Sequence, residues 1–427
     1  MTFVQSIFSY LAFCIAFPFL ATNKKIRRDF RRRFGFYNQG EVPKADGPTI
    51  WFHGASAGDI TALHPTVVAL RALEPKACIV VSSVTNSGYT TAQKLEADFN
   101  YITYQPYDIP GPVHRTLNAI QPHALVLEYT ELWPQLIFAC KNRGIPVFLH
   151  NGRFSAAGMG KYKLLFRLVG NLVSPLTKLL LRDEHEAGRA RELGAQESQI
   201  LVTGNTKFDN TGANLDSTKA AVLREHLGIK DGELVWVAGS THEGEEELLL
   251  KVFSRLRQEF PALRMIIAPR YAHRGERIAN IVKAQGFTCQ LRSSKTKIPA
   301  DVSVLNSVGE LAACYALGTV VFVGGSFVSR GGQNILEPAS WGRPVIFGPH
   351  MHNFPDAVKV LLGRGGLQAA TAKQLEEIIL RLLRQPEYRQ KLGKLAVNQI
   401  QAIRGAAQRN AQEIAKGLKK NYTQPTT

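Results

Sequence analysis

The stretch Val320–Phe354, VVFVGGSFVSRGGQNILEPASWGRPVIFGPHMHNF, decides the fold class of this chain. A β-branched run, Thr319–Val323, stops at Gly324–Ser326, and a second glycine pair leads into a helix that we expect to open near Asn334–Glu337. A second apolar strand follows at Pro344–Phe347. Strand, glycine turn and helix start in this order form the unit that directs backbone N–H groups and a positive helix end at a phosphate.

The same stretch carries residues suited to a nucleotide. Backbone N–H groups around Gly325 and Ser326 are expected to face a phosphate, and Glu337, in the first helical turn, can accept hydrogen bonds from ribose hydroxyls. An ordinary βαβ unit with glycine-rich connections is the alternative for this stretch taken alone.

Short apolar strands alternate with helical segments over most of the chain, which indicates parallel α/β sheets covered on both faces. With 427 residues the chain is long enough for two such domains. We expect helices at Asp59–Leu73 and Pro134–Arg143. The expected strands are Thr49–Phe52, Cys78–Val81, Tyr101–Tyr104, Ala124–Leu127, Pro146–Leu149 and Leu179–Leu181, then Leu234–Ala238, Met265–Ala268, Val302–Leu305, Thr319–Val323 and Pro344–Phe347.

A polar stretch near residues 210–219 interrupts this alternation and marks the expected domain boundary. The sequence thus divides into an N-terminal segment, residues 1–33, a first domain, 34–212, and a second domain, 213–427. Ser240 and Glu243 form a capping-box pattern at the first helix of the second domain. Residues 371–420 are rich in helix signals and are expected to close the second domain, with a return to the first as the alternative.

The N-terminal segment joins an apolar run, Phe3–Leu20, to seven cations within Lys24–Arg33, opposed there only by Asp29. Eighteen helical residues reach about 27 Å, just short of a hydrocarbon core of about 30 Å. A cleaved signal peptide carries its cations before the apolar run, and a buried core helix does not normally end in such a cluster. We therefore expect an uncleaved anchor, spanning or partly inserted, whose cations bind anionic lipid and keep the following domains cytoplasmic.

The net charge of +18 suggests an anionic partner. Nucleic acid is not expected, because no basic stripe with interleaved aromatic residues and no nucleic-acid motif is present. An enzyme beside a membrane, acting on an anionic substrate, accounts for the charge equally well. The five cysteines are scattered without CxxC spacing, which favours neither a disulfide framework nor a zinc site.

Polar and glycine-rich blocks follow the expected strands throughout the chain. They read His53–Asp59 (HGASAGD), Thr130–Pro134 (TELWP), Asn151–Ser155 (NGRFS), Gly204–Asp209 (GNTKFD), Gly239–Glu245 (GSTHEGE), Pro269-Arg270, Gly309–Leu311 (GEL), Gly324–Ser326 (GGS), Asn334–Glu337 (NILE), and Gly348–His350 with Asn353-Phe354. In this order and spacing the chain resembles the 3-deoxy-D-manno-octulosonic acid (Kdo) transferases of lipopolysaccharide synthesis, over essentially its whole length.

The resemblance implies the GT-B architecture, with two Rossmann-like domains and an N-terminal anchor helix. It implies transfer of Kdo from CMP-Kdo to a lipid A precursor at the inner membrane of a bacterium, with no cofactor and no metal. Asp59 takes the position of the general base, and Glu131 and Lys207 those of transition-state stabilisers. On the same resemblance we expect Ser56, Gly58 and Arg153 to bind the acceptor. The residues expected to bind the nucleotide are Pro269, Arg270, Val308, Gly309, Glu310, Gly325, Ser326, Asn334, Ile335, Leu336 and Glu337.

General chemistry agrees with these roles. An attacking hydroxyl needs a carboxylate to take its proton, a carboxylate such as Glu131 answers positive charge on the sugar, and cations such as Lys207 and Arg270 answer negative charge on the phosphate. Read individually, Asp59 is equally a helix-start residue, Glu131 a helix cap and Lys207 a surface lysine. His53 is expected to pack or hydrogen-bond rather than titrate.

The chain departs from the family pattern at three places. Asp59 replaces a glutamate, Glu128-Tyr129 replaces the Met-Glu that often precedes Thr-Glu, and Val308 replaces a methionine. The first departure leaves two alternatives open: a related transferase with another activated acidic sugar or acceptor, and a non-catalytic lipid-binding descendant. The number of sugars added, the preferred acylation of the acceptor and the oligomeric state do not follow from the sequence.

Overall fold

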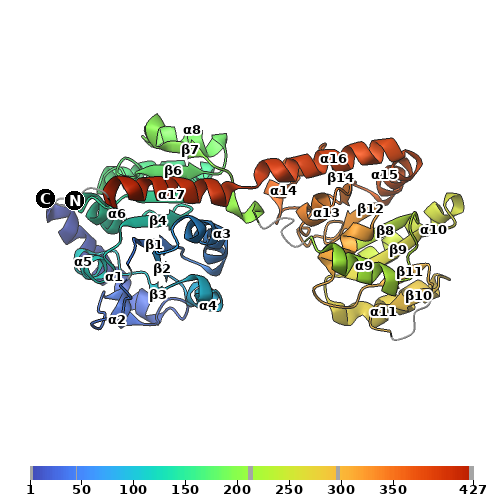
Figure 1. Cartoon of the computed structure of the whole chain (residues 1–427), viewed down its shortest axis with the longest axis horizontal. Helices are drawn as coiled ribbons and strands as arrows, with labels where there is room; N and C mark the ends of the chain where they lie inside the picture. Colours follow the sequence, from blue (N-terminus) through green and yellow to red (C-terminus); the bar gives the residue numbers. More distant parts are fainter. Residues whose placement is uncertain (1–2, 45, 210–214, 295–298, 423–427) are drawn as a thin grey trace. The chain divides into compact units, whose positions relative to one another are not determined.

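The computed structural model describes residues 3–44, 46–209, 215–294 and 299–422, and it divides into two units. Unit 1 comprises Met1–Asp209 and Ile403–Thr427, and unit 2 comprises Asn210–Ala402 (Figure 1). Each unit contains one seven-stranded sheet in which all paired strands run parallel. The predicted α/β class with two Rossmann-like, doubly wound domains is confirmed.

The sheet of unit 1 has the strand order β3-β2-β1-β4-β5-β6-β7. Its strands are β1 Thr49–His53, β2 Cys78–Ser83, β3 Tyr101–Tyr104, β4 Ala124–Glu128, β5 Val147–Gly152, β6 Lys178–Leu181 and β7 Ile200–Val202. Its helices are α1 Phe3–Thr22, α2 Phe30–Arg33, α3 Ala57–Leu73, α4 Asn86–Lys94, α5 Pro110–Ile120, α6 Pro134–Asn142, α7 Met159–Val169, α8 Glu184–Glu192 and α17 Ala406–Tyr422.

Alternate residues of these strands point into two separate hydrophobic cores. Trp51 belongs to the core beneath α5, α6 and α8, whereas its neighbours Ile50 and Phe52 belong to the core beneath α3 and α17. Because side chains alternate across a strand, a sheet covered on both faces needs apolar residues at nearly every position. This is why the strands of unit 1 read as continuous apolar runs in the sequence.

The sheet of unit 2 has the strand order β10-β11-β9-β8-β12-β13-β14. Its strands are β8 Val235–Thr241, β9 Arg264–Pro269, β10 Cys289–Leu291, β11 Val302–Val304, β12 Val320–Val323, β13 Val345–Phe347 and β14 Gly366–Gln368. Its helices are α9 Ser217–His226, α10 Glu245–Glu259, α11 Gly275–Ala284, α12 Leu311–Cys314, α13 Leu336–Ser340, α14 Pro355–Leu361, α15 Ala372–Arg384 and α16, which runs from Pro386 to Ile403.

Two details of unit 2 differ from the sequence analysis. Helix α10 begins at Glu245 after Gly244, so Ser240 and Glu243 form no capping box there. Ser240 instead lies within β8 with a φ of 55°. The expected boundary after residue 212 falls outside the described residues.

The last helix, α17, belongs to unit 1, where it packs against α3 and β4 (Figure 1). Its apolar residues Ala411, Ile414 and Leu418 enter the same core as Ile50 and Phe52. We expected residues 371–420 to close the second domain, and α15 and α16 do so. The return of α17 to the first domain is the alternative left open by the sequence, and burial of this apolar face explains it.

The N-terminal segment packs onto unit 1. The ring of Phe13 of α1 contacts that of Tyr107, with centroids 4.9 Å apart and planes tilted by 55°, and the amide of Gly111 donates to the Tyr10 hydroxyl at 3.0 Å. Arg33 is only 2% exposed and donates to the carbonyls of Arg28 and Val84. In the part of the chain that the structure describes, no helix is both long and apolar enough to cross a membrane.

Candidate functional site

The strand order of unit 1 reverses between β1 and β4, the position at which open parallel sheets bind ligands beside their carboxyl ends. His53 ends β1, and Asp59 lies in the first turn of the helix that follows. Glu131 follows β4, and Lys207 lies in the short 3-10 helix Thr206–Phe208 that follows β7. The three predicted catalytic residues therefore come from one edge of one sheet.

Asp59 stabilises the start of α3. Its Oδ2 accepts the backbone N–H of Ser56, the N-cap residue, at 2.8 Å. Oδ1 has no hydrogen-bond partner among the described residues, and the side chain is half-buried. The helix-start contact and a proton-accepting oxygen thus coexist in one carboxylate. Gly58 next to it is exposed, so its backbone is open to solvent.

Glu131 pairs with a histidine at the floor of the site. Its Oε2 lies 3.6 Å from Nε2 of His53, whose ring is fully buried, whereas the Glu131 side chain is 26% exposed. Nδ1 of His53 shares a hydrogen bond of 2.9 Å with the Ser82 hydroxyl on β2. The buried ring of His53 therefore lies on the inner side of the Glu131 carboxylate, and the exposed side of that carboxylate stays accessible to a ligand.

Tyr129 brings the cationic residues together. A φ of 52° turns its side chain, and Nζ of Lys207 lies 5.3 Å from the centroid of its ring. Burial raises the pKa of the Tyr129 hydroxyl, and the negative charges of Glu128 and Asp59 raise it further, whereas the positive charge of Arg153 lowers it. Those charges lie close enough to the ring for Tyr129 to stand among the predicted acceptor and catalytic residues. Arg153 and Lys207 are both exposed.

A buried polar network, absent from the sequence analysis, supports these loops. The Glu128 carboxylate accepts from Nδ2 of Asn151 at 2.8 Å and bonds Nδ1 of His150 at 2.5 Å. Asn151 also bonds the hydroxyl of Thr206 at 2.6 Å, and Nε2 of His150 bonds the Thr66 hydroxyl at 2.7 Å. Thr206 directly precedes Lys207, so the network ties the lysine loop to the ends of β4 and β5. The one feature of the sequence that could have indicated this network is Glu128, a carboxylate at the end of the apolar run ALVLE of β4.

The glycine loop of unit 2 is built differently from our expectation. The carboxylate of Glu245, only 1% exposed, accepts the backbone N–H groups of Gly325 at 2.7 Å, Ser326 at 3.0 Å and Phe327 at 2.9 Å. It also accepts the N–H of His242 at 2.9 Å. The amides expected to face a phosphate are thus used within the protein.

Close packing explains the glycines of this loop. A Cβ on Gly324 would lie 2.8 Å from the Glu245 carboxylate and 2.7 Å from the carbonyl oxygen of Ser240. Gly325 has a φ of 67°, which side chains rarely adopt. The hydroxyl of Ser326 is fully buried, donates to the Val323 carbonyl and accepts from the Gly348 amide. This part of the motif therefore maintains the loop itself.

The other predicted nucleotide residues of unit 2 differ in their exposure and in their contacts. Glu337 is partly buried, accepts from Asn334 at 3.1 Å, and burial raises its pKa. Two of these side chains are exposed: Arg270, which directly follows β9, and Val308, which is 90% exposed.

The remaining predicted nucleotide residues contribute little free side-chain surface. The side chains of Ile335 and Leu336 are buried, and Glu310 is paired with Arg292 at 2.9 Å. Pro269 ends β9, and Gly309 has a φ of 87°.

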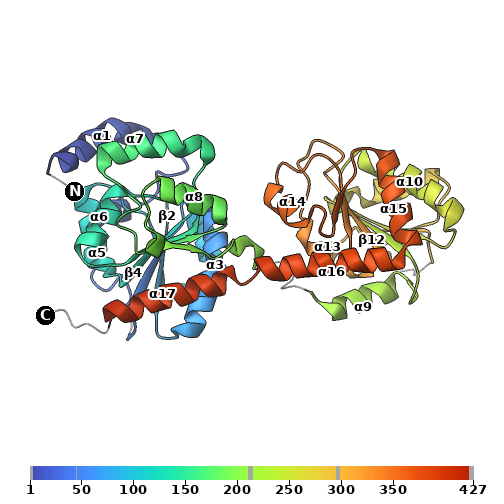
Figure 2. The same cartoon turned by 90° about the horizontal axis from the view of Figure 1, so that it is seen from above.

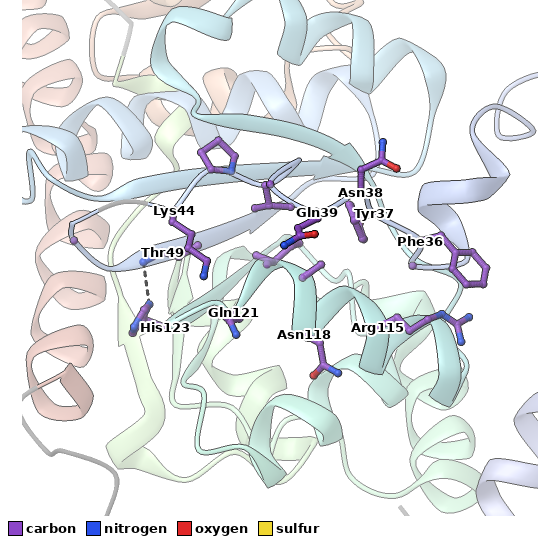
Figure 3. Close-up of a pocket in the computed structure, with 17 residues that line it drawn as sticks. Phe36, Tyr37, Asn38, Gln39, Lys44, Thr49, Arg115, Asn118, Gln121 and His123 are labelled. Carbon is purple, nitrogen blue, oxygen red and sulfur yellow. Dashed lines mark hydrogen bonds between the residues drawn. The ribbon is translucent and has the colours of Figure 1, made fainter.

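Unit 1 also has a pocket away from these strand ends, with a volume of about 930 Å³, and none of the predicted site residues lines it (Figure 3). It lies at the amino end of β1, where the amide of Thr49 donates to Nδ1 of His123 at 3.0 Å (Figure 3). Since ligands of doubly wound sheets bind at the carboxyl ends, the strand ends described above remain the candidate site. Within the described ranges no group of three or more His, Cys, Asp or Glu side chains is arranged to hold a metal ion.

Comparison with known proteins agrees with this organisation. The sequence model of the family described as 3-deoxy-D-manno-octulosonic-acid transferase (kdotransferase) matches residues 28–210. The chain is 32% identical over 403 residues to the 3-deoxy-D-manno-octulosonic acid transferase of Haemophilus influenzae, covering 93% of each chain. It is 30% identical over 395 residues to the enzyme of that name from Chlamydophila psittaci, covering 91% of this chain and 90% of the relative.

A solved glycosyltransferase from Rickettsia africae superposes with a TM-score of 0.56 at 13% identity, covering 88% of this chain and all of that one, which supports the fold alone. The sequence relatives carry the stronger evidence, since they span nearly the full length of both proteins at 30% identity or more. The chain belongs to the 3-deoxy-D-manno-octulosonic acid transferase family and is a glycosyltransferase.

Proposed function

We propose that this protein transfers Kdo from CMP-Kdo to a lipid A precursor in lipopolysaccharide core synthesis, as an inverting enzyme attached to the cytoplasmic face of a bacterial inner membrane. The observation that carries the proposal is the grouping of Asp59, Glu131 and Lys207 at the strand ends beside the reversal of strand order in unit 1. These positions match the family motifs that the sequence analysis identified.

The proposed reaction joins an acceptor hydroxyl to the anomeric carbon of Kdo. As the new C–O bond forms, the bond between that carbon and the CMP phosphate breaks, and its electron pair goes to the phosphate oxygen. Asp59 takes the hydroxyl proton, since its Oδ1 has no other partner in the described structure. Glu131 opposes positive charge on the sugar, and Lys207, held over Tyr129, opposes negative charge on the leaving phosphate.

Unit 2 is proposed to bind CMP-Kdo through groups other than the glycine amides. Arg270 is exposed at the end of β9, where its guanidinium can pair with the phosphate. Glu337 is an acceptor for ribose hydroxyls. The single phosphate of CMP carries less negative charge than a diphosphate. We therefore propose that Arg270 and Lys207 neutralise it without a bound metal or other cofactor.

Attachment to the membrane is proposed to be interfacial. The outer face of α1 exposes Leu11, Ile15 and Phe19, which are 59%, 83% and 69% accessible. An apolar helix face followed by basic residues is suited to lie in the plane of an anionic bilayer surface. Arg31 and Arg32 pair with Glu41 within the protein, while the exposed cations after α1 are Lys24, Lys25, Arg27 and Arg28.

The test of the transfer is to incubate the full-length protein with CMP-Kdo and a lipid A precursor and to follow the acceptor by mass spectrometry. We expect addition of Kdo. Preference for another nucleotide-activated acidic sugar or another acceptor would identify a related transferase. Binding of the lipid without transfer of any sugar would identify a non-catalytic descendant.

The membrane proposal is tested separately by flotation with vesicles that contain phosphatidylglycerol. Ile15→Asp should weaken vesicle binding, because it places a charge on the apolar face of α1, and high salt alone should not release the unmodified protein. Complete release by salt would show that the attachment is purely electrostatic.

A further inference from the structure

A second pocket of unit 1 lies beneath α1 and has a volume of about 390 Å³. Such a volume falls in the range of about 300–1,000 Å³ typical of small-molecule sites. Phe13, Ala16 and Leu20 of α1 contribute one wall, and Ile109 and Val169 contribute apolar surface opposite. Val169 ends α7, which lies beside α1 (Figure 2).

Two faces of α1 are used in different ways. The residues that line the pocket follow one another at intervals of three and four positions, which places them on one side of the helix. Leu11, Ile15 and Phe19 form another side and are exposed. The pocket side is the one that packs onto unit 1, where the ring of Phe13 contacts that of Tyr107, and the pocket is the space that this packing leaves beneath the helix.

Three hydrogen-bond donors of the pocket lining lack partners. Nε2 of Gln105, the hydroxyl of Tyr107 and Nε1 of Trp133 are buried and make no hydrogen bond to any described residue. Buried donors are nearly always paired in folded proteins, so three in one pocket indicate a ligand that supplies acceptor oxygens. A ligand with oxygens at one point and hydrocarbon elsewhere matches both the donors and the apolar walls.

The charge of the lining favours an uncharged oxygen. The carboxylate of Asp108 also lines the pocket, and it accepts the amides of Gln135 and Leu136 at the start of α6. The guanidinium of Arg33 is bonded to two backbone carbonyls. An anionic phosphate would therefore meet a carboxylate and no unengaged cation, whereas an ester or amide carbonyl would meet three donors.

The pocket shares its wall with the candidate catalytic edge. The ring of Trp133 contacts that of His53, with centroids 5.9 Å apart, and His53 holds Glu131. Oε1 of Gln105 accepts from the Ser82 hydroxyl at 3.4 Å, and Ser82 also bonds His53. A molecule seated in the pocket is thus one side chain away from the carboxylate that we assign to the transition state.

We infer that this pocket binds one acyl chain of the acceptor lipid, with Gln105, Tyr107 and Trp133 donating to the oxygens of its ester or amide linkage. The inference rests on the proposed function and deepens it, because α1 then forms part of the acceptor site as well as the membrane contact. The acyl chain enters between α1 and the segment that follows β3, and its ester or amide linkage places the sugar of the acceptor beside Glu131.

The test compares two acceptors that differ only in their chains: the acylated lipid A precursor and its fully deacylated sugar bisphosphate. The variable is the ratio of their kcat/KM values, measured with full-length protein in detergent micelles. Ala16→Trp narrows the pocket, and each methylene kept out costs about fourfold in affinity. We expect the preference for the acylated acceptor to fall by about 10- to 60-fold.

Cys14→Trp is the matched control, because Cys14 is an exposed small residue of α1 outside the pocket lining. It should retain the preference of the unmodified protein. Trp133→Phe keeps an aromatic ring, although a smaller one, and removes one donor, so it should lower the preference in the same direction as Ala16→Trp. An unaltered ratio in Ala16→Trp, or an equal loss for both acceptors, would overturn the inference.

A binding experiment separates this inference from the proposed reaction. A photoreactive acyl amide should label α1 or the segment 105–109 in the unmodified protein and label Ala16→Trp much less, as read by peptide mass spectrometry. Labelling without Kdo transfer to either acceptor would leave the pocket assignment intact and refute the reaction. Reduced binding of Ala16→Trp to phospholipid vesicles with no change in the acceptor ratio would assign the pocket to a bilayer lipid and overturn the inference.

Discussion

In unit 1 the buried carboxylate of Glu128 binds side chains, whereas in unit 2 the buried carboxylate of Glu245 binds the backbone. The first orients His150 and Asn151 and, through Thr206, the loop that carries Lys207. The second fixes the glycine loop after β12. Two sheets of related topology thus use a buried acid for different ends, and a glycine-rich turn can be shaped by an internal carboxylate instead of a phosphate.

This comparison is tested most severely by Glu245→Ala. The substitution leaves three buried N–H groups and the partly buried N–H of Phe327 without an acceptor. At about 1–3 kcal/mol for each buried group, we expect the free energy of unfolding to fall by about 3–9 kcal/mol. Denaturant unfolding of the full-length protein measures the change. Glu243→Ala is the control, because Glu243 pairs with Arg277 at the exposed surface and should cost less than about 1 kcal/mol. Equal effects of the two substitutions would show that the glycine loop does not depend on Glu245.

Lys207→Met sharpens the comparison from the side of unit 1. Loss of a cation that stabilises transition-state charge should lower kcat by about 100- to 1,000-fold. Equilibrium binding of CMP, measured by calorimetry, should stay the same, because Lys207 is assigned to the chemical step. Lys207→Arg, which keeps the charge, should recover part of the rate. A loss of CMP affinity that matches the loss of rate would place Lys207 in the donor site.

Variants of unit 2 should have the opposite signature. Glu337→Ala and Arg270→Ala each remove one charged hydrogen-bonding group and should weaken CMP binding by about 10- to 150-fold. Burial raises the pKa of Glu337, so its acceptor form is lost as the pH falls through that raised value. CMP affinity should therefore decline on acidification, and this part of the pH dependence should be missing in Glu337→Ala. Unchanged CMP affinity in both variants would remove unit 2 as the donor site.

The fold could be predicted from the sequence because strands covered on both faces leave long apolar runs. All eleven expected strands are present, with bounds shifted by a few residues at most. The strands missed are β7, β10 and β14: β10 and β14 each contain a glutamine that interrupts the apolar run, and β7 has only three residues. Helix α17 was recognisable as a helix, but its pattern does not say which core its apolar face enters.

The candidate site could be predicted only as far as local motifs determine it. Asp59, Glu131 and Lys207 follow strands, and the topology brings them to one edge. The use of the Gly325 and Ser326 amides depends on Glu245, which lies about eighty positions away in the sequence. The support from Asn151 depends on a backbone φ of 49°, which no local pattern indicates.

The central claim is that Asp59 is the base for Kdo transfer to a lipid acceptor, although its side chain is one methylene shorter than the glutamate usual in the family. The most direct measurement is the rate of Kdo transfer by Asp59→Asn and Asp59→Glu, with folding and CMP binding checked in each. The asparagine keeps an oxygen for the Ser56 amide but cannot take a proton, so transfer should fall by about 100- to 10,000-fold while CMP binding persists. The glutamate should retain a substantial part of the rate if the site accepts the family geometry, and lose it if the site is built around the shorter chain. Transfer by Asp59→Asn at the rate of the unmodified protein would contradict the account and leave Asp59 as a helix-start residue.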